Sequence, residues 1–242
     1  MADERRGPSS LPSRVYTRRP ASPPAAALAA LATYGACHVA DVVGTGVMSA
    51  RIAPIDRPVE ALAGAAVTVR VTPGDFRMIP WAVDQLGRGD VLVIDGGGNR
   101  DRAIWGDFVG ARAAALGCAA VVVDGAARDA PGLARLALPV FARTLAARGP
   151  TKSGRGEVNV PVSCGGVCVT PGDLIVADGE GIVVVPAGDL DQVVELVRER
   201  QARAPGPPAD VTRADEAWRA YLAAGASDWE GPEIHERRWD GT

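Results

Sequence analysis

The chain has 242 residues, 47% of them hydrophobic and 5% aromatic, with a formal net charge of −3. This length suits one large domain, or one domain with long tails, that buries a substantial core. The small negative charge gives no general attraction to nucleic acid or to an anionic membrane. We find no run of about 18 uncharged apolar residues and no apolar signal core near the start, so we expect no membrane span and a cytoplasmic protein.

The cysteines are Cys37, Cys118, Cys164 and Cys168. Cys118 lies among alanine and valine residues and is expected to be a small buried hydrophobic residue. Cys164 and Cys168 have C-x3-C spacing without a second pair or a nearby histidine, which disfavours a zinc site. Because no secretory signal is found, all four are predicted to be reduced thiols.

Composition divides the chain into three parts. Residues 1–23 carry five arginines with several prolines and serines, and are predicted to form a flexible N-terminal arm. The alternative is an arm that binds anions or a neighbouring subunit. Residues 24–204 contain the periodic segments of one folded domain. Residues 205–242 begin with a Pro-Gly-Pro-Pro linker, and the tryptophans of this tail suggest docking on its own or a neighbouring subunit.

The first predicted element is a helix over 25–43, which ends at Gly44-Thr45-Gly46. Strands are predicted over 65–71 and 91–94. The second is an uninterrupted apolar run, typical of a strand that is covered on both faces. A glycine-rich loop is expected at 95–99, where an aspartate is followed by three glycines and an asparagine.

Asp107 is predicted to be the N-cap of a helix that ends at Gly117. A buried strand over 121–123 leads into a turn at Arg128-Asp129. The remaining elements are short strands and turns followed by an amphipathic helix; they are expected at 138–141, 158–163, 167–170, 174–177, 182–185 and 189–203.

Glycine-rich segments invite a test for nucleotide binding. Gly96-Gly97-Gly98 follows a strand, but it does not satisfy G-x-G-x-x-G, and the helix does not begin at the glycines. Lys152-Ser153-Gly154 resembles a phosphate loop in composition only, because the G-x-x-x-x-G-K order is absent. The sequence therefore disfavours a dinucleotide or ATP site.

The most informative pattern is Asp107, twenty intervening residues, and then Arg128-Asp129. A helix start offers free N–H groups to a carboxylate, Arg128 offers a two-pronged cationic clamp, and Asp129 offers a hard oxygen ligand. Taken alone, Asp107 is more often a helix cap, and an Arg-Asp turn is more often a surface ion pair. Their joint position after two successive core strands places both turns at one sheet edge, where α/β proteins bind ligands.

Several segments around these residues match one known family. They read GDVLVIDGGG at 89–98, WGD at 105–107, VDGAARD at 123–129, LPVFAR at 138–143, NVPV at 159–162, CGGV at 164–167, PGD at 171–173 and VVVP at 183–186. In these segments the chain resembles the RraA-like family. That family includes the regulator of ribonuclease E activity A and the class II 4-hydroxy-4-methyl-2-oxoglutarate/4-carboxy-4-hydroxy-2-oxoadipate aldolases. The resemblance covers about residues 25–200, so 24–204 is expected to be an RraA-like catalytic domain.

The resemblance implies an α/β fold, a swivelling-domain-like β/β/α sandwich, assembled as a homotrimer or a dimer of trimers with sites near subunit boundaries. It also implies that Asp129 binds Mg²⁺ or Mn²⁺ and that Arg128 grips a small 2-keto acid. Asp107 would orient a catalytic water, and the amides of Phe108 and Val109, next to Gly106, would receive the substrate carboxylate. Family members also use acidic residues of a neighbouring subunit; the tail of this chain offers Glu230, Glu233 and Glu236.

The leading hypothesis is metal-dependent cleavage of a 4-hydroxy-2-oxo acid to pyruvate, with oxaloacetate decarboxylation as a side activity. No lysine is predicted on a core strand, which favours the metal route over an imine. The alternative is a non-catalytic regulator that binds a ribonuclease or another protein. A third hypothesis is a lyase acting on a sugar-derived keto acid, with a pocket reshaped by residues 70–88, including Trp81.

Overall fold

The structure is a computed structural model that describes residues 12–18, 20, 22–55, 57–203 and 214–223. The chain forms two compact units, residues 1–197 and residues 198–242. The second unit contains residues 198–203 of α5 (Leu190–Arg203) and the helix α6 (Ala214–Ala223). The expected docking of Trp229 and Trp239, and the three tail glutamates, lie outside the described residues.

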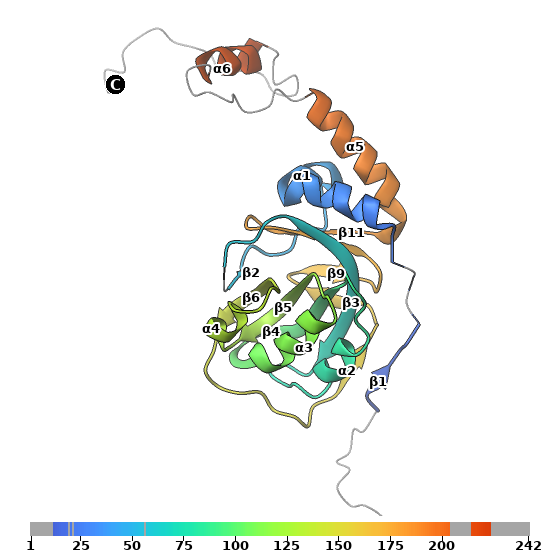
Figure 1. Ribbon diagram of the computed structural model, residues 1–242, viewed down its shortest axis with the longest axis vertical. Helices are drawn as coiled ribbons and strands as arrows, with labels where there is room; N and C mark the ends of the chain where they lie inside the picture. Colours follow the sequence, from blue (N-terminus) through green and yellow to red (C-terminus); the bar gives the residue numbers. More distant parts are fainter. Residues whose placement is uncertain (1–11, 19, 21, 56, 204–213, 224–242) are drawn as a thin grey trace, which may run out of the picture. The chain divides into compact units, whose positions relative to one another are not determined.

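The first unit is built on a sheet with the strand order β1-β7-β3-β4-β5-β6-β2 (Figure 1). Its central strands, β3 to β6, are parallel to one another, so their carboxyl ends lie along one edge. β7 and β2 pair antiparallel to β3 and β6. The bounds are β1 (Arg14–Val15), β2 (Ala53–Pro54), β3 (Leu62–Val71), β4 (Val91–Trp105), β5 (Ala120–Ala127), β6 (Val140–Leu145) and β7 (Gly156–Val158).

β3 belongs to two sheets, because its first residues pair with β10 and its later residues pair with β4. β10 (Leu174–Ala177) and β11 (Ile182–Val185) form an antiparallel hairpin that continues the second sheet. β8 (Val162–Cys164) and β9 (Val167–Val169) form a separate two-stranded sheet.

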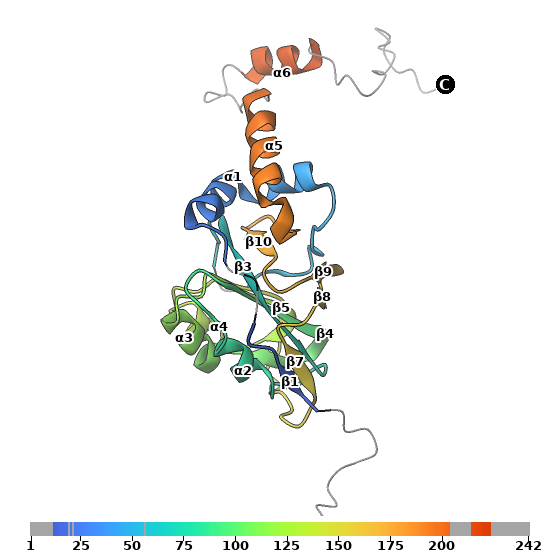
Figure 2. The ribbon, with the colours of Figure 1, turned by 90° about the vertical axis from the view of Figure 1, so that its right-hand side faces the viewer.

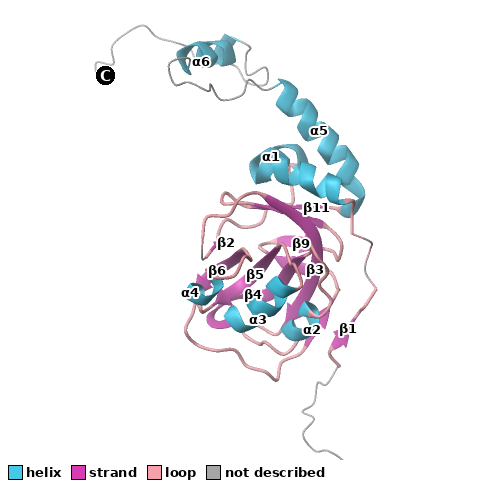
Figure 3. Ribbon diagram, viewed as in Figure 1, coloured by secondary structure: helices cyan, strands magenta, loops and turns pink. Residues whose placement is uncertain are grey.

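Helices cover both outer sides of this arrangement (Figures 2 and 3). Buried residues of α2 (Ile79–Val83), α3 (Asp107–Ala115) and α4 (Ala130–Leu133) form a hydrophobic cluster with one face of the main sheet. α1 (Ala25–Val43) and the first turns of α5, which follow the short helix η1 (Ala187–Asp189), pack on β10 and β11.

Side chains alternate between the two faces of the central strands. In β4, Leu92 and Ile94 join the cluster under α2, α3 and α4, whereas Val91 and Val93 join the cluster that also contains buried residues of β10 and β11. The expectation that this apolar strand is covered on both faces is therefore confirmed. The predicted α/β fold, a β/β/α sandwich, is confirmed as well, with α1 and α5 as a further helical layer.

α1 differs from the sequence expectation in two ways. Gly35 has φ 75° and ψ 169°, so two helical segments meet there, and Ala36 N donates a 2.7 Å hydrogen bond to Asp178 Oδ2. By length and by its mean hydropathy of 1.5, α1 is also a candidate membrane span, although no such run was expected. Core helices of soluble proteins have the same properties, and Leu31 and Val39 are buried against the β10–β11 layer.

The glycine-rich segment after Ile94 was predicted to be a loop, and this is wrong. β4 continues through it to Trp105, with register shifts relative to β5 between Asp95 and Trp105. Local glycines make such irregular pairing possible without ending the strand. The longer strand carries the backbone directly to the start of α3.

Part of the predicted N-terminal arm lies along the domain. β1 pairs in parallel with β7, and Tyr16 N donates a 3.2 Å hydrogen bond to Val158 O. Asn159 returns a 2.7 Å hydrogen bond from its side-chain Nδ2 to Tyr16 O. Residues 1–11 lie outside the described residues.

Candidate active site

The turns that follow β4 and β5 lie next to each other. These strands pair in parallel to their last residues, Trp105 and Ala127. Arg128 N then donates a 2.9 Å hydrogen bond to Trp105 O, which continues the pairing beyond the strands. Gly106 and Arg128, distant in sequence, are therefore neighbours in space.

α3 begins at Asp107 with Gly106 as its N-cap, so the prediction that Asp107 is the cap is wrong by one residue. No described side chain caps this helix end. Gly110 N is the first amide that donates back into the helix, to Gly106 O at 3.0 Å. The N–H groups of Phe108 and Val109 therefore have no acceptor within the helix, and they lie at the positive end of its dipole, where a carboxylate is favoured.

Asp129 has a left-handed backbone conformation, φ 59° and ψ 37°, at the N-cap of α4. Aspartate tolerates this conformation better than most residues. Its carbonyl accepts hydrogen bonds from Gly132 N at 2.8 Å and Leu133 N at 2.9 Å, which fixes the turn. The carboxylate is 40% exposed, and its Oδ2 lies 3.3 Å from Arg128 Nε.

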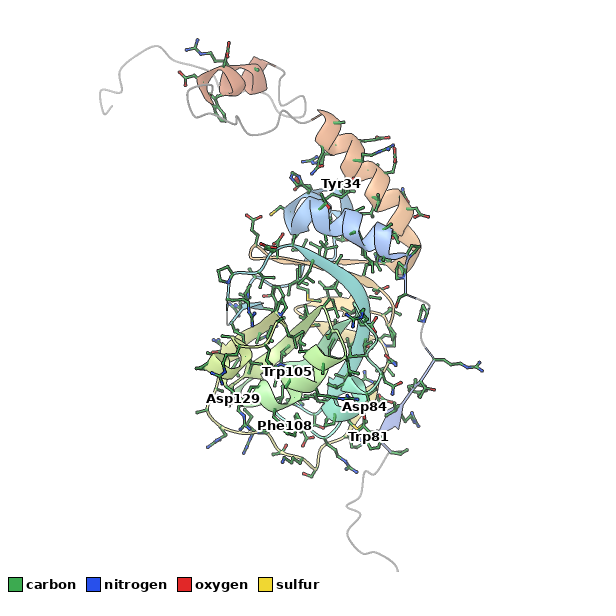
Figure 4. The ribbon with its side chains drawn as sticks, in the orientation of Figure 1. Tyr34, Trp81, Asp84, Trp105, Phe108 and Asp129 are labelled. Carbon is green, nitrogen blue, oxygen red and sulfur yellow. The ribbon has the colours of Figure 1, made fainter. Side chains whose placement is uncertain are left out.

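These two turns border a cavity of about 230 Å³. Trp105, Phe108 and Asp129, labelled in Figure 4, are among the residues around it. The full lining combines aromatic, aliphatic and charged residues: Phe76, Ala103, Ile104, Trp105, Gly106, Phe108, Val109, Arg128, Asp129, Pro150 and Lys152. Of the segment 70–88, Phe76 lines the cavity and Trp81 does not.

Every predicted site residue except Asp107 lines this cavity. A Cβ placed on Gly132 would lie 2.1 Å from Asp107 Oδ2, so the Asp107 carboxylate packs against α4. A Cβ on Gly106 would lie 2.5 Å from Asp129 Oδ2. A side chain at either glycine would therefore collide with a carboxylate: Gly132 lies against Asp107, and Gly106 lies against Asp129.

Sequence reasoning did not place several of the lining residues in the site, and two of these, Lys152 and Trp105, carry polar side-chain groups. Lys152 was considered only as part of a failed phosphate-loop motif, yet it is the one lysine among 26 basic residues of the chain. The presence of a single lysine in a chain rich in arginine was the sequence signal that could have drawn attention to Lys152. Trp105 is 1% exposed, and its Nε1 is buried without a hydrogen-bond partner among the described residues.

The side chains that line the cavity determine whether a divalent cation could be held there. No group of three or more His, Cys, Asp or Glu side chains that could enclose a metal ion occurs among the described residues. Within the described part of the chain, Asp129 is the one carboxylate that lines the cavity, and its side chain is partly open to solvent. This fits a Mg²⁺-like ion that keeps most of its water ligands, and it does not fit an all-protein cage.

The cysteines take no part in this site. In the structure all four are free thiols, and Cys118 and Cys164 are buried. Burial raises the pKa of the Cys118 thiol to about 11. Its Sγ lies 3.1 Å from Ala120 O and 3.3 Å from Asp90 O. The prediction that Cys118 is a small buried residue is confirmed.

Comparison with known proteins agrees with this fold. The family model described as "RraA-like: Aldolase/RraA" matches residues 36–184. A relative from Halalkalibacterium halodurans, named "Putative 4-hydroxy-4-methyl-2-oxoglutarate aldolase", is 41% identical over 67% of this chain and 78% of its own length.

Two solved structures extend the comparison. Streptomyces coelicolor RraAS2, described as an unusual member of the RNase ES inhibitor RraA protein family, has a TM-score of 0.67 at 26% identity, over 74% of this chain and 94% of its own. The RNA-processing inhibitor RraA from Thermus thermophilis has a TM-score of 0.56 at 31% identity, over 62% of this chain and 91% of its own.

A sandwich fold with paired turns at the ends of two parallel strands thus defines the class, and the chain belongs to the RraA-like family. Its relatives include proteins named as aldolases and proteins described as inhibitors of RNA processing. Membership in the family therefore leaves both kinds of function to be weighed at the site.

Proposed function

We propose that this protein is a divalent-metal-dependent lyase that cleaves a 4-hydroxy-2-oxo acid to pyruvate and a second carbonyl compound, with oxaloacetate decarboxylation as a side activity. The observation that carries the proposal is the convergence of three groups on one cavity: the uncapped start of α3, Arg128 and Asp129. These are an anion-binding helix end, a guanidinium and a hard oxygen ligand, which a small 2-keto acid and a cation require.

The chain's own groups have separate tasks in this reaction. The N–H groups of Phe108 and Val109 bind the C1 carboxylate of the substrate. The C4 hydroxyl loses its proton, the C3–C4 bond breaks, and its electron pair forms the pyruvate enolate, which is then protonated at C3. Arg128 stabilises the charge that develops on the C2 oxygen. Asp107 does not itself line the cavity, but it directly follows Gly106, which does, and it is proposed to orient the water that takes part in proton transfer.

Asp129 is the residue that would hold Mg²⁺ or Mn²⁺, and the bound cation would supply Lewis-acid polarisation of the 2-oxo group. The described histidine, His38, belongs to α1 and does not line the cavity. Imidazole is therefore not proposed as the acid or base of this reaction.

The test is pyruvate release from 4-hydroxy-4-methyl-2-oxoglutarate and from oxaloacetate, in Mg²⁺ and in EDTA. The informative variant is Asp129→Asn, because asparagine tolerates the left-handed backbone that alanine would strain. Asp84→Asn is the matched control: Asp84 is exposed, forms a 3.8 Å ion pair with Arg112 and does not line the cavity. We expect turnover that needs both the metal and Asp129. Activity that survives in EDTA would contradict the metal-dependent reaction.

A non-catalytic regulator is the second candidate, favoured by the likeness to RraA proteins described as RNA-processing inhibitors. Absence of turnover by a folded protein in Mg²⁺, together with capture of a protein partner, would favour it. Turnover of a sugar-derived keto acid, but not of the two substrates above, would favour the third hypothesis.

In the lyase proposal, the protein acts in the cytoplasm on a small 2-keto acid and assembles with copies of the same chain. Nucleic acid and membrane are not among its proposed partners.

A further inference from the structure

The first unit has a second hollow, a basic groove of about 320 Å³. It lies where the end of β3 pairs antiparallel with the start of β7. Its lining comes from these two strands and the residues next to them: Arg70, Val71, Thr72, Arg155, Gly156 and Glu157. None of these residues lines the cavity that contains Arg128 and Asp129. The groove is therefore a candidate binding site of its own.

The N-terminal arm adds a further arginine beside this groove. β1 and β7 lie side by side in Figure 2, and their pairing sets Arg14 opposite Glu157. The pairing of β7 with β3 sets Arg70 opposite the same glutamate. Directly opposite residues of neighbouring strands have adjacent side chains on one face of a sheet. An arm that binds anions was one of the alternatives left open by the sequence, and one of its arginines lies at this groove.

Glu157 holds two of the arginines and leaves most of their donors unused. Its Oε1 lies 3.6 Å from Arg14 Nη1, and its Oε2 accepts a hydrogen bond from Arg70 Nη2. A guanidinium has five N–H donors, so one contact with a carboxylate leaves others for a second partner. The Arg14 and Arg70 side chains are each 51% exposed, so a ligand from solvent can reach these donors.

Arg155 has a fixed backbone and an unused side chain. Its N–H donates a 3.1 Å hydrogen bond to Thr72 Oγ1, and Thr72 N donates a 2.9 Å hydrogen bond to Arg155 O. Within the described part of the chain, the guanidinium of this exposed residue has no hydrogen-bond or ion-pair partner. The groove therefore offers a complete guanidinium on a segment whose position is set by β3.

The charges at the groove do not balance. Arg14, Arg70 and Arg155 together with Glu157 give a local charge of +2, although the whole chain carries −3. The next residue of the same row is Asp95, opposite Arg70 on β4. It does not line the groove, because its carboxylate accepts hydrogen bonds from the N–H groups of Gly97 at 3.1 Å and Ser163 at 3.3 Å.

A dianion is the ligand that would balance this local charge. A phosphate monoester carries about −1.5 to −2 at pH 7 and has three acceptor oxygens. Guanidinium groups bind phosphate through paired, charge-assisted hydrogen bonds, which a single carboxylate oxygen cannot match in number. The volume of the groove is at the lower end of the range for small-molecule sites, roughly 300–1,000 Å³.

We propose that this groove binds a phosphate group, either free inorganic phosphate or the phosphate of a small metabolite, through Arg14, Arg70 and Arg155. The proposal goes beyond the lyase function and does not depend on it, because the groove and the cavity share no described lining residue.

The test is calorimetry with glycerol 3-phosphate and with inorganic phosphate, in EDTA so that no metal at Asp129 takes part. Arg155→Met should weaken binding of both about tenfold or more, because a charge-assisted partner is lost. Arg155→Lys should keep part of the affinity, since it keeps the charge. Arg51→Met is the matched control, because Arg51 is exposed and does not line the groove; it should bind like the native protein.

A second variant separates the groove from the proposed active site, which is also suited to an anion. Arg128→Ala removes the guanidinium of the cavity and should leave phosphate binding within about twofold of the native protein. Binding that is lost in Arg128→Ala and kept in Arg155→Met would overturn the proposal, as would a native protein that binds neither ligand. Neither result would bear on the lyase function.

The two ligands identify the source of the phosphate once binding depends on Arg155. Equal dissociation constants would assign the groove to the phosphate group alone, as for inorganic phosphate. Tighter binding of glycerol 3-phosphate would assign it to a phosphorylated metabolite whose organic part also contacts the groove.

Discussion

The contact between Gly106 and Asp129 shows how much of this site depends on the absence of one methyl group. Gly106 has an ordinary extended backbone, so glycine is not needed there for conformation. It is needed for space, because a Cβ would stand 2.5 Å from the Asp129 carboxylate. The far end of a partly exposed side chain can move aside, so the substitution would disturb the site more than the fold.

Gly106→Ala is therefore expected to reduce metal-dependent turnover at least about tenfold while costing less than about 1 kcal/mol of stability. Turnover as a function of Mg²⁺ concentration, together with urea unfolding, measures the two effects. Gly188→Ala is the control, because a Cβ there meets no atom within 4 Å. Native turnover in Gly106→Ala would mean that the position of the Asp129 carboxylate does not matter.

Arg128 is expected to act on substrate binding and on the transition state. Arg128→Ala should raise the KM for a 2-keto acid and lower kcat, because the substrate loses a charge-assisted partner worth roughly 1.5–3 kcal/mol. The side chain is 45% exposed, so little change in stability is expected. Steady-state kinetics measure both constants, and unchanged values would remove Arg128 from the mechanism.

The sequence could place Arg128 and Asp129 because the pair follows directly after a buried strand. It could not place Lys152, whose approach to the cavity depends on hydrogen bonds to Asp75, Arg102 and Ala103, far away in the chain. The packing of Asp107 against Gly132 was equally hidden, because it depends on how α3 and α4 meet.

Among the elements, the segment around Lys152 depends on Asp75. Burial tends to raise the pKa of this carboxyl group, but hydrogen bonds from Thr151 and from the N–H groups of Arg77, Gly154 and Ser153 outweigh burial, so the pKa is lowered. A lowered pKa in the folded state means that the carboxylate contributes stability above the unfolded value of about 3.9. That contribution is lost as the pH falls through the lower folded value.

Asp75→Asn should accordingly cost about 1–3 kcal/mol of unfolding free energy at pH 7, because an amide cannot replace all the acceptor sites of the carboxylate. The difference from the native protein should shrink as the pH falls below about 4. Urea unfolding at pH 7 and pH 3 measures it, with the exposed Asp101→Asn as control. A difference independent of pH would show that the ionised form of Asp75 is not what holds the segment.

The periodicity of apolar residues predicted which segments are helices and which are strands. It did not predict where those helices and strands become irregular. The apolar runs of β4, β5, β10 and β11 and the amphipathic pattern of α5 identified these elements in the sequence. The continuation of β4 through its glycines and the interruption of α1 at Gly35 depend on tertiary partners, namely β5 and Asp178. Local sequence contains no information about such partners.

For the whole molecule, the layered fold was predictable because doubly covered strands require helices or a second sheet on each face. Assembly was expected only from the resemblance to the family. Exposed aromatic side chains on the helical layer, Trp81 at 57% and Phe108 at 91%, give a physical reason for it.

We therefore expect light scattering to give three or six copies of the 24.9 kDa chain. Trp81→Ser should shift the mass towards the monomer at low concentration, since an interface that buries this side chain would lose much of its apolar area. Thr33→Ser, on the exposed side of α1, is the control. A monomeric native protein would contradict the expected assembly.

The single lysine has a practical consequence for observing the protein at work. Amine-selective reagents such as succinimidyl esters can modify one side chain of this protein, and that side chain lies at the cavity. Beyond the α-amino group, any mass added by such a reagent reports on the cavity alone. The rate of acylation, followed with and without a small 2-keto acid, is thus a direct readout of occupancy that needs no engineered label.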